Sequence, residues 1–383
     1  MQTTINKLCV ISDSYPYKKD NSCVFVRDLI VEIAKSKIKC IVITPERIKL
    51  RKKKRPYHYI DESRGGNIIS VYSPRFISLS SRGILIKATS YFHKKAVLRV
   101  LKKERISPDV LYGHFIYQCG LTAIETARIL KCKSVVVCGE STGRLEKGSR
   151  PYATGLKLCK WKEKLSSANE IISVSSENLR ILRELNYIDN IVSTHVIPNS
   201  VNTDIFRKID RTESRKKLGW NEADFIIIFV GHFIQRKGPD RVDLAASKIK
   251  GVRTAFIGAG SFEPKSDCLF CGTVQHDDLP KYLCAADAFV LPTTGEGCCN
   301  AIIEAICCGL PIISSNSKFN DDILDDSFSI RIDPNNVEEI MNAILVLKND
   351  LELRKRMSSA ALEISGRFSL ENRAKKIVEI LNK

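Results

Sequence analysis

Short apolar runs alternate with stretches of helical spacing along most of the chain. Residues 8–12 and 40–44 are apolar runs, and between them residues 24–36 carry apolar side chains three or four positions apart. Apolar runs of this length bounded by polar loops predict buried strands, and the wider spacing predicts an amphipathic helix. The chain therefore opens with a βαβ unit, in which a helix joins two parallel strands.

The same alternation continues to about residue 200 and then begins again. The first set predicts strands at 109–112, 134–138, 171–174 and 194–198 and a helix at 121–130. The second set predicts strands at 225–230, 254–257, 288–291 and 311–314 and helices at 240–249, 279–285, 301–308, 337–347 and 351–364. Two such sets predict an α/β protein with two doubly wound, Rossmann-like domains, residues 1–198 and 199–368. Ligands would bind in a cleft faced by the carboxyl ends of both sheets.

Composition excludes several other classes of protein. Of 383 residues, 44% are hydrophobic and 27% are charged, with 20 Gly and 13 Pro, which excludes collagen, low-complexity disorder and a coiled coil. Every apolar run falls well short of the roughly 18–20 residues of a membrane-spanning helix. The N-terminus lacks a basic and then apolar signal segment, and the 14 cysteines are spread through a long chain. We therefore expect a reducing cytoplasm.

The net charge of +18 belongs entirely to the first half of the chain. Residues 1–200 contain 36 Lys and Arg against 17 Asp and Glu, whereas residues 201–383 contain 25 against 26. Residues 47–55 and 64–105 concentrate the excess. Such a basic surface fits a solvated face, a nucleic acid or an anionic membrane. Because the chain has no zinc-finger, helix-turn-helix or RNA-recognition signature, we expect no nucleic-acid partner.

Segment 84–105 predicts a basic amphipathic helix. Its apolar positions recur with helical spacing, and its lysines and arginines fall mostly between them. Such a helix can lie on anionic headgroups, with Lys94, Lys95, Lys102 and Lys103 as the contacts, which would make the protein peripheral at the inner face of the cell membrane. It can equally pack its apolar face on its own domain.

A Gly-rich loop follows the predicted strand at 288–291. It contains Glu296 and leads into a predicted helix near Asn300, with Glu304 one turn further on. Asn caps helices, and the amide groups and dipole of a helix N-terminus hold phosphates. A carboxylate at Glu304 is placed to bind sugar hydroxyls. Two acidic residues in such positions are more often solvated side chains, so this pattern alone is weak evidence for a binding site.

A second loop follows the predicted strand at 225–230. Gly231 permits close backbone approach, and Lys237 offers a positive charge to a diphosphate. The alternative is a surface loop that leads into a helix.

Together these motifs resemble the retaining glycosyltransferases of family 4, or group 1, which have the GT-B fold of two Rossmann-like domains. The resemblance runs through most of the second half, in segments 196–206, 231–238, 257–260, 271–274 and 285–292, and in Glu296 and Glu304, which have seven residues between them. The first half is less similar and contributes segments 15–16, 25–29, 113–115 and 139–141. Segment 368–372 resembles the start of a helix, about 369–383, that crosses back to the first domain.

The resemblance implies a donor site in the second domain. Lys237 would neutralise the diphosphate of a nucleotide sugar, Glu304 would hold the ribose, and Glu296 would contact the transferred sugar. The remaining donor-site positions are Gly231, His232, Arg236, Cys298, Cys299 and Asn300. The family needs no metal and no other cofactor, because basic side chains and a helix N-terminus replace a divalent cation.

In the first domain the resemblance implies that His114 lies near the sugar and the leaving oxygen. Tyr15, Asn21 and Ser22 belong to the loop on the acceptor side. The implied reaction transfers a hexose-type sugar to a hydroxyl group with retention at the anomeric carbon. The implied acceptor is an oligosaccharide or a lipid-linked glycan of capsular, exopolysaccharide or O-antigen synthesis.

Two alternatives to this reaction remain. One is a sugar-nucleotide epimerase of the same fold, and the other is a basic nucleic-acid or membrane-binding protein without catalysis.

The chain departs from the family pattern in two loops. His232 stands where members usually carry arginine, which removes one fixed charge from the diphosphate unless His232 is protonated or Arg236 substitutes. The first loop reads Asp-Asn-Ser at 20–22 where paired glycines are common. Asn tolerates the left-handed backbone conformation, so the turn itself is compatible with this sequence.

The cysteines and the remaining histidines point to no metal site. Cys268 and Cys271 form a CxxC pair without a second pair at zinc-site spacing, and 298–299 and 307–308 are adjacent pairs, which chelate poorly. We interpret most cysteines as small buried apolar residues. Four histidines remain as surface or structural residues: His58, His93, His195 and His276.

Overall fold

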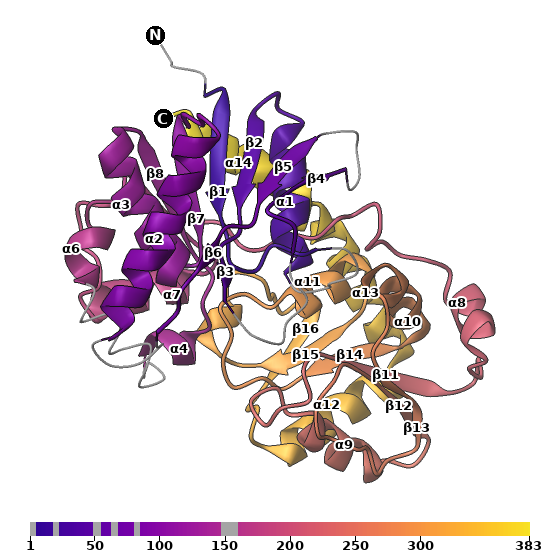
Figure 1. The fold of residues 1–383 in the computed structure, drawn as a ribbon. Coiled ribbons are helices and arrows are strands. Elements are labelled where there is room, and N and C mark those ends of the chain that lie inside the picture. Colours follow the sequence, from indigo (N-terminus) through magenta and orange to yellow (C-terminus); the bar gives the residue numbers. More distant parts are fainter. Residues whose placement is uncertain (1–4, 18–22, 49–54, 63–67, 80–84, 147–159) are drawn as a thin grey trace. The chain divides into compact units, whose positions relative to one another are not determined.

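The computed structural model describes residues 5–17, 23–48, 55–62, 68–79, 85–146 and 160–383. The chain forms two compact units, one made of Met1–Pro198 with Arg373–Lys383 and the other of Asn199–Asn372. Figure 1 labels their helices and strands along the chain. The predicted cleft between the two sheets stays a prediction.

The first unit follows the predicted alternation, with additional short strands. Its strands are β1 (Lys7–Ile11), β2 (Lys39–Ile43), β3 (Glu46–Arg47), β4 (His58–Asp61), β5 (Ile69–Tyr72), β6 (Arg75–Phe76), β7 (Val110–His114), β8 (Lys133–Cys138), β9 (Glu170–Ser173) and β10 (Ser193–Val196). Its helices are α1 (Val24–Ala34), α2 (Leu85–Lys103), α3 (Leu121–Leu130), α4 (Thr142–Glu146), α6 (Trp161–Leu165) and α7 (Ser176–Glu184), and a π-helical turn covers Ile116–Gly120.

Eight of these strands form one sheet in the order β10-β9-β8-β7-β1-β2-β5-β4. All neighbours are parallel except β4, which runs antiparallel to β5. From β1 the chain moves outward to β2 and β5 and then returns to place β7 on the other side of β1. Ligands of doubly wound folds bind at such a switch point, outside the carboxyl ends of the strands.

Helix α2 packs its apolar face on its own unit. Val97, Val100 and Leu101 are buried in a core cluster with residues of β1, β7 and α3. The segment therefore packs its apolar face on its own domain, which is the second of the two alternatives considered for it. This apolar face is not available to lipid. The reason is that burial against the sheet removes the same apolar area from water without a membrane. The outer face carries the exposed charges of Lys95, Lys102 and Lys103.

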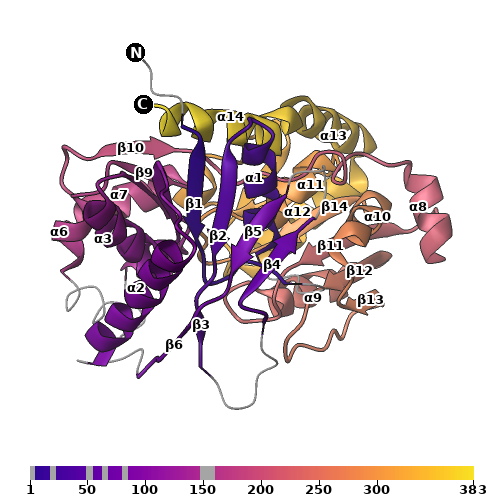
Figure 2. The same cartoon turned by 45° about the horizontal axis from the view of Figure 1, so that its top comes forward.

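The last helix, α14 (Leu370–Leu381), belongs mostly to the first unit. The Lys133 ammonium donates to the Ile380 carbonyl oxygen at 2.8 Å, and the Ile5 amide donates to Asn382 Oδ1 at 3.0 Å. The segment that begins at Ile5 and the end of α14 therefore lie side by side, as Figure 2 shows next to β1.

The second unit has a six-stranded sheet. Its strands are β11 (Phe225–Val230), β12 (Val252–Ile257), β13 (Cys268–Gly272), β14 (Ala288–Leu291), β15 (Ile312–Ser315) and β16 (Ser329–Ile332). Its helices are α8 (Arg211–Leu218), α9 (Pro239–Ser247), α10 (Leu279–Ala285), α11 (Asn300–Cys307), α12 (Val337–Asn349) and α13 (Leu351–Ser365), with 3-10 turns at His276–Asp278, Lys318–Asn320 and Gly366–Phe368.

This sheet is parallel throughout, in the order β13-β12-β11-β14-β15-β16. The chain moves from β11 outward to β12 and β13 and returns to β14 on the other side of β11. The switch point of the second unit therefore lies between β11 and β14.

A buried arginine fixes this central pair of strands. The Arg215 side chain on α8 is fully buried and donates to Asp287 Oδ2 at 2.8 Å and to the Ala285 carbonyl oxygen at 2.8 Å. The same Asp287 oxygen accepts from the Ile226 amide in β11 at 2.7 Å. Because Asp287 directly precedes β14, this paired buried charge connects the starts of β11 and β14.

The sequence-based prediction lacks several elements, among them the short strands β4, β5, β13 and β16 and the helices α7 and α8. These strands have only four or five residues and half-exposed positions, so they lack the continuous apolar run of a central strand. Among the described helices, none combines the length and the hydropathy needed to cross a bilayer.

Candidate functional site

Two loops of the second unit leave the sheet side by side. The first follows β11 and contains Gly231, His232, Arg236 and Lys237, and the second follows β14 and leads to α11. Since β11 and β14 are neighbouring parallel strands, both loops begin at the same edge of the sheet.

Glu296 connects the two loops through a cluster of charges. Its Oε1 lies 2.7 Å from Lys237 Nζ and 2.5 Å from Arg236 Nη1, and it accepts a hydrogen bond from Thr293 Oγ1 at 2.9 Å. Arg236 also donates to the Gly295 carbonyl oxygen. The Lys237 side chain is only 10% exposed and that of Glu296 only 12%. The alternative of a surface loop does not hold for Lys237, because the lysine is buried and neutralises a buried carboxylate.

The cluster keeps its charges ionised. Burial by itself raises the pKa of the Glu296 carboxyl, but the charges of Lys237 and Arg236 outweigh this effect and hold that pKa below its ordinary value. Burial by itself lowers the pKa of the Lys237 ammonium, but the attraction of Cys299 and Glu296 leaves it raised. The site therefore contains two cations and one carboxylate at neutral pH.

Helix α11 begins beside this cluster. Cys299 is its N-cap residue and makes no side-chain capping bond, and its sulfur lies 3.8 Å from Lys237 Nζ. The prediction that Asn300 caps the helix is wrong, because Asn300 is already helical and its Oδ1 accepts from Asn199 Nδ2 at 2.8 Å. Asn199 also donates to the Cys298 carbonyl oxygen at 3.2 Å. Asn199 thus holds the loop in place, a role that sequence reasoning missed.

Glu304 is buried one turn into α11 and faces His276. Its Oε1 lies 3.0 Å from His276 Nε2, and the His276 ring packs 4.9 Å from the Phe206 ring. His276 was expected to be a surface or structural residue, and the structure instead gives it direct contact with a candidate site residue. The sequence carried no signal for this pair, because 28 residues separate the two side chains.

The backbone near Gly231 approaches the next strand closely. A Cβ atom at Gly258 would lie 1.8 Å from the Gly231 carbonyl oxygen, so Gly258 cannot carry a side chain without a shift of the backbone. His232, directly after Gly231, is exposed. Its ring is therefore accessible to an anion at the edge of the sheet.

His114 ends β7 in the first unit and is a neutral imidazole. Burial lowers its pKa to about 3, and the nearby charge of Arg373 from the C-terminal segment acts in the same direction. The ring packs 4.8 Å from Phe115 and 5.7 Å from Phe25. Within the described residues, its buried Nδ1 atom has no hydrogen-bond partner.

The acceptor-side residues are only partly described. Tyr15 is fully buried, and its hydroxyl donates to Asp61 Oδ2 at 2.6 Å. Its ring therefore packs in the interior of the first unit, and its role on the acceptor side stays a prediction. Asn21 and Ser22 lie outside the described residues.

The four lysines predicted for a membrane contact differ in their surroundings. Lys94 Nζ lies 2.5 Å from Glu125 Oε2, so this lysine has an intramolecular partner, and its membrane contact stays a prediction. Lys103 is exposed and its ammonium stacks 4.3 Å from the Tyr57 ring centroid. Lys95 and Lys102 are exposed on the same helix.

The described cysteines are all free thiols. Cys271 of the CxxC pair is exposed and Cys268 is half-buried. Among the described residues, the ligand atoms of Asp13, His93 and Cys119 form the one group that could hold a metal ion. This group lies in the first unit, and the sequence analysis did not single it out.

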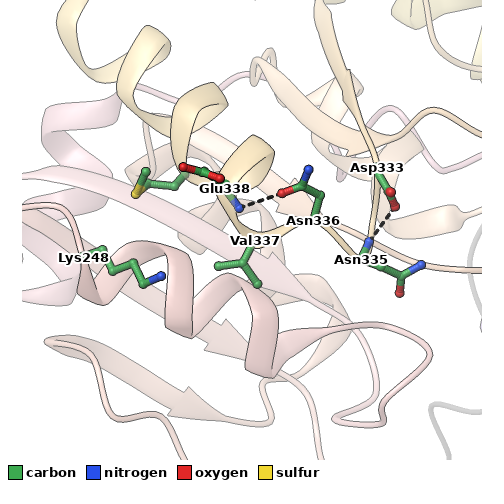
Figure 3. Close-up of a pocket in the computed structure, with 7 residues that line it drawn as sticks. Lys248, Asp333, Asn335, Asn336, Val337 and Glu338 are labelled. Carbon is green, nitrogen blue, oxygen red and sulfur yellow. Dashed lines mark hydrogen bonds between the residues drawn. The ribbon is translucent and has the colours of Figure 1, made fainter.

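A cavity of about 630 Å³ in the second unit lies away from these residues (Figure 3). It is lined by Lys248, Asp333 and the start of α12, where Asn336 Oδ1 accepts from the Glu338 amide at 3.0 Å. The Asn336 side chain caps α12 through this bond, so one end of the hollow belongs to the helix start.

The chain matches two family models. The model described as "Glycosyl transferases group 1" covers residues 210–363, and the model described as "Glycosyltransferase Family 4" covers residues 24–205. The first match contains Lys237, Glu296 and Glu304, and the second contains His114.

The curated relatives include two bacterial proteins. The chain is 24% identical over 255 residues to a putative teichuronic acid biosynthesis glycosyltransferase, TuaC, of Bacillus subtilis, a match that covers 65% of this chain and 64% of the relative. It is 27% identical over 312 residues to a UDP-Gal:alpha-D-GlcNAc-diphosphoundecaprenol alpha-1,3-galactosyltransferase of Escherichia coli, with 74% and 77% covered.

Solved structures share the fold over nearly the whole chain. A sucrose-phosphate synthase of Thermosynechococcus elongatus superposes with a TM-score of 0.79 at 18% identity, covering 98% of each chain. HepE of Anabaena, solved with UDP, gives a TM-score of 0.70 at 15% identity, covering 98% of this chain and 99% of that chain. With two Rossmann-like units, the chain has the GT-B fold, and its two parts are similar to the group 1 and family 4 glycosyltransferases.

Proposed function

We propose that this protein transfers a sugar from a nucleotide diphosphate donor to a hydroxyl acceptor with retention at the anomeric carbon. The observation that carries the proposal is the cluster of Lys237, Arg236 and Glu296 at the switch point of the second sheet. Two solved structures of one relative of the fold support a nucleotide sugar, since HepE of Anabaena was solved with UDP and with UDP-glucose.

Lys237 and the start of α11 stabilise the leaving diphosphate. An ammonium group has three N–H donors, and Lys237 directs one at Glu296 Oε1 and one at Cys299 Sγ, which leaves one donor for a phosphate oxygen. The amide groups of the first turn of α11 add partial positive charge. Charge stabilisation in a buried site favours the transition state, in which the bond to the diphosphate breaks and negative charge develops on its oxygens.

Glu296 orients the sugar and does not attack it. Because two cations and Thr293 share its Oε1 atom, the carboxylate is a poor nucleophile. Retention then follows from departure and attack on the same face of the sugar, with an oxygen of the leaving phosphate accepting the proton of the acceptor hydroxyl. Lys237, Arg236 and the helix N-terminus supply the charge that a divalent cation supplies in metal-dependent transferases.

Glu304 binds the ribose of the donor. His276 contacts Oε1 of Glu304, which leaves Oε2 to accept hydrogen bonds from ribose hydroxyls. In the first unit, His114 is neutral, so in the proposed reaction it would act as a hydrogen-bonding group rather than as a charge.

The acceptor is a lipid-linked glycan of surface-polysaccharide synthesis, held by the first unit at an anionic membrane on its cytoplasmic side. The names of two relatives support this class of acceptor, since one refers to teichuronic acid synthesis and the other to a diphosphoundecaprenol-linked sugar. The distribution of charge supports it too, because the excess lies in residues 1–200. The electrostatic contribution is about 1 kcal/mol for each lysine or arginine near such a surface.

The first prediction concerns the reaction itself. We expect transfer from one nucleotide diphosphate sugar of a panel, without added Mg²⁺ or Mn²⁺, because protein cations neutralise the diphosphate. The measurement is product formation, with the anomeric configuration read from the proton coupling constant by NMR. An absolute requirement for added Mg²⁺ or Mn²⁺ would contradict the metal-free site, an inverted product would contradict retention, and an epimerised donor without transfer would favour the epimerase.

The second prediction concerns the buried ion pair. Lys237→Met should lower kcat/KM by about 10- to 150-fold, the equivalent of about 1.5–3 kcal/mol for a lost charged contact. It should also lower the free energy of unfolding. The loss should be smaller than the roughly 3–5 kcal/mol seen when a buried charge loses its partner, because Arg236 remains beside Glu296. Adding Glu296→Gln should restore stability without restoring turnover. Lys248→Met, at an exposed lysine of the same unit, is the matched control and should change neither quantity.

The same pair predicts a dependence of stability on pH. The pKa of Glu296 is lowered in the folded protein, so the pair stabilises the fold above the ordinary carboxyl range and is lost as the pH falls through the folded pKa. The difference in unfolding free energy between the parent and Glu296→Gln should therefore shrink in acid. A constant difference down to about pH 3 would rule out an ionised Glu296 as its source.

The third prediction concerns His232. If its ring contacts the diphosphate as an imidazolium, donor affinity should weaken as the pH rises from about 6 to about 8, and His232→Arg should remove that dependence. Calorimetric titration with the nucleotide diphosphate that the donor releases, repeated across this pH range, measures the affinity. His195→Gln, in the first unit, is the control and should keep the parent profile. A flat profile for the parent would show that His232 makes no such contact.

The fourth prediction concerns the membrane. We expect binding to vesicles that contain anionic lipid, little binding to neutral vesicles, and release at about 1 M salt, where the screening length is roughly 3 Å. Changing Lys95, Lys102 and Lys103 together to Glu should abolish vesicle binding and spare donor affinity. The same change at Lys216, Lys248 and Lys250 of the second unit alters net charge equally and should have little effect. Equal loss in both triple variants would assign the effect to net charge and contradict the α2 surface.

A further inference from the structure

A buried histidine of the first unit belongs to a polar cluster that the proposed reaction does not use. His93 on α2 is fully buried, and its Nε2 atom lies 2.9 Å from Asp13 Oδ1. Its Nδ1 atom lies 2.8 Å from Thr122 Oγ1. The Cys119 thiol is also buried, and the ligand atoms of Asp13, His93 and Cys119 all lie within 4.8 Å of one another.

Three separate segments bring these side chains together. Asp13 follows β1, Cys119 is in the turn after β7, and His93 comes from the middle of α2. Since β1 and β7 are neighbouring parallel strands, Asp13 and Cys119 lie at the switch point of this sheet, where doubly wound folds bind their ligands.

From this arrangement we propose that Asp13, His93 and Cys119 bind a zinc ion. Carboxylate oxygen, imidazole nitrogen and thiolate sulfur are the three ligand types of zinc sites, and a thiolate with an imidazole selects zinc against magnesium or calcium. Binding releases the thiol proton to solvent, so that two negative ligands balance the charge of Zn²⁺. The Asp13 side chain is one-third exposed, which gives the ion a path from solvent and a fourth position for water or a ligand atom.

Thr122 is the outer partner that orients the histidine. A zinc-bound imidazole commonly donates its second N–H to an oxygen, which fixes the tautomer and the plane of the ring. The contact between His93 Nδ1 and Thr122 Oγ1 fits this arrangement, with Nε2 left for the metal. The site is in the first unit and does not depend on the proposed donor chemistry, so the two can fail separately.

The experiment is metal binding by the whole protein after treatment with a chelator. We expect one equivalent of Zn²⁺ to bind and to raise the melting temperature, and Co²⁺ in its place to give a thiolate-to-cobalt charge-transfer absorption. Cys119→Ser should remove that absorption, and His93→Gln should weaken binding strongly. Thr122→Val should weaken binding by about 10- to 100-fold and keep the absorption, as expected for an outer partner.

Two other cysteine variants separate this site from the remaining thiols. Cys132 packs against the same core cluster outside the group, so Cys132→Ser should behave as the parent. Changing Cys268 and Cys271 together to Ser removes the CxxC pair and should leave binding intact. No binding by the parent, an absorption that survives Cys119→Ser, or an absorption that disappears with the CxxC pair would each overturn the proposal. If Cys119→Ser does not melt cooperatively, Thr122→Val alone decides, and unchanged affinity in that variant counts against the site.

Discussion

The pairing of β11 with β14 is the constraint on which the candidate donor site depends. These strands are distant in the sequence. The Asp287 carboxylate, directly before β14, links them because it binds both the buried Arg215 guanidinium and the Ile226 amide of β11. Their common carboxyl edge brings the loops of Lys237 and Glu296 together. A change that displaced one strand against the other would separate the charges of the site while each loop kept its own sequence.

Oppositely charged side chains of the site pair with one another, and this pairing matters both for stability and for the proposed function. A buried carboxylate is costly unless it is paired, and Glu296 is paired with Lys237 and Arg236. The resulting group has one excess positive charge, which is what an anionic leaving group requires. The buried pair thus holds the two loops together and leaves positive charge at the edge of the sheet.

The first unit is chemically different, although its sheet has a switch point of the same kind. His114 is neutral because it is buried among aromatic rings, and the outer face of α2 carries the exposed charges of Lys95, Lys102 and Lys103. Next to β1 and β7, His93 is held by Asp13 and Thr122. These partners offset the cost of desolvating the buried His93 ring.

Local patterns in the sequence determined the alternation of strands and helices and the two Rossmann-like sets. They also located the loops before Glu304 that carry Lys237 and Glu296. Apolar spacing and glycine placement are properties of neighbouring residues, so the sequence alone contains them. Only the tertiary structure decided which side chains meet. Glu296 and Arg236 are 60 residues apart, His276 and Glu304 are 28 apart, and His93 and Asp13 are 80 apart. It also decided that the apolar face of α2 packs on its own sheet and that Asn300 contacts Asn199 instead of capping α11. These outcomes depend on the order of the strands in each sheet, and strand order is set by packing between distant segments.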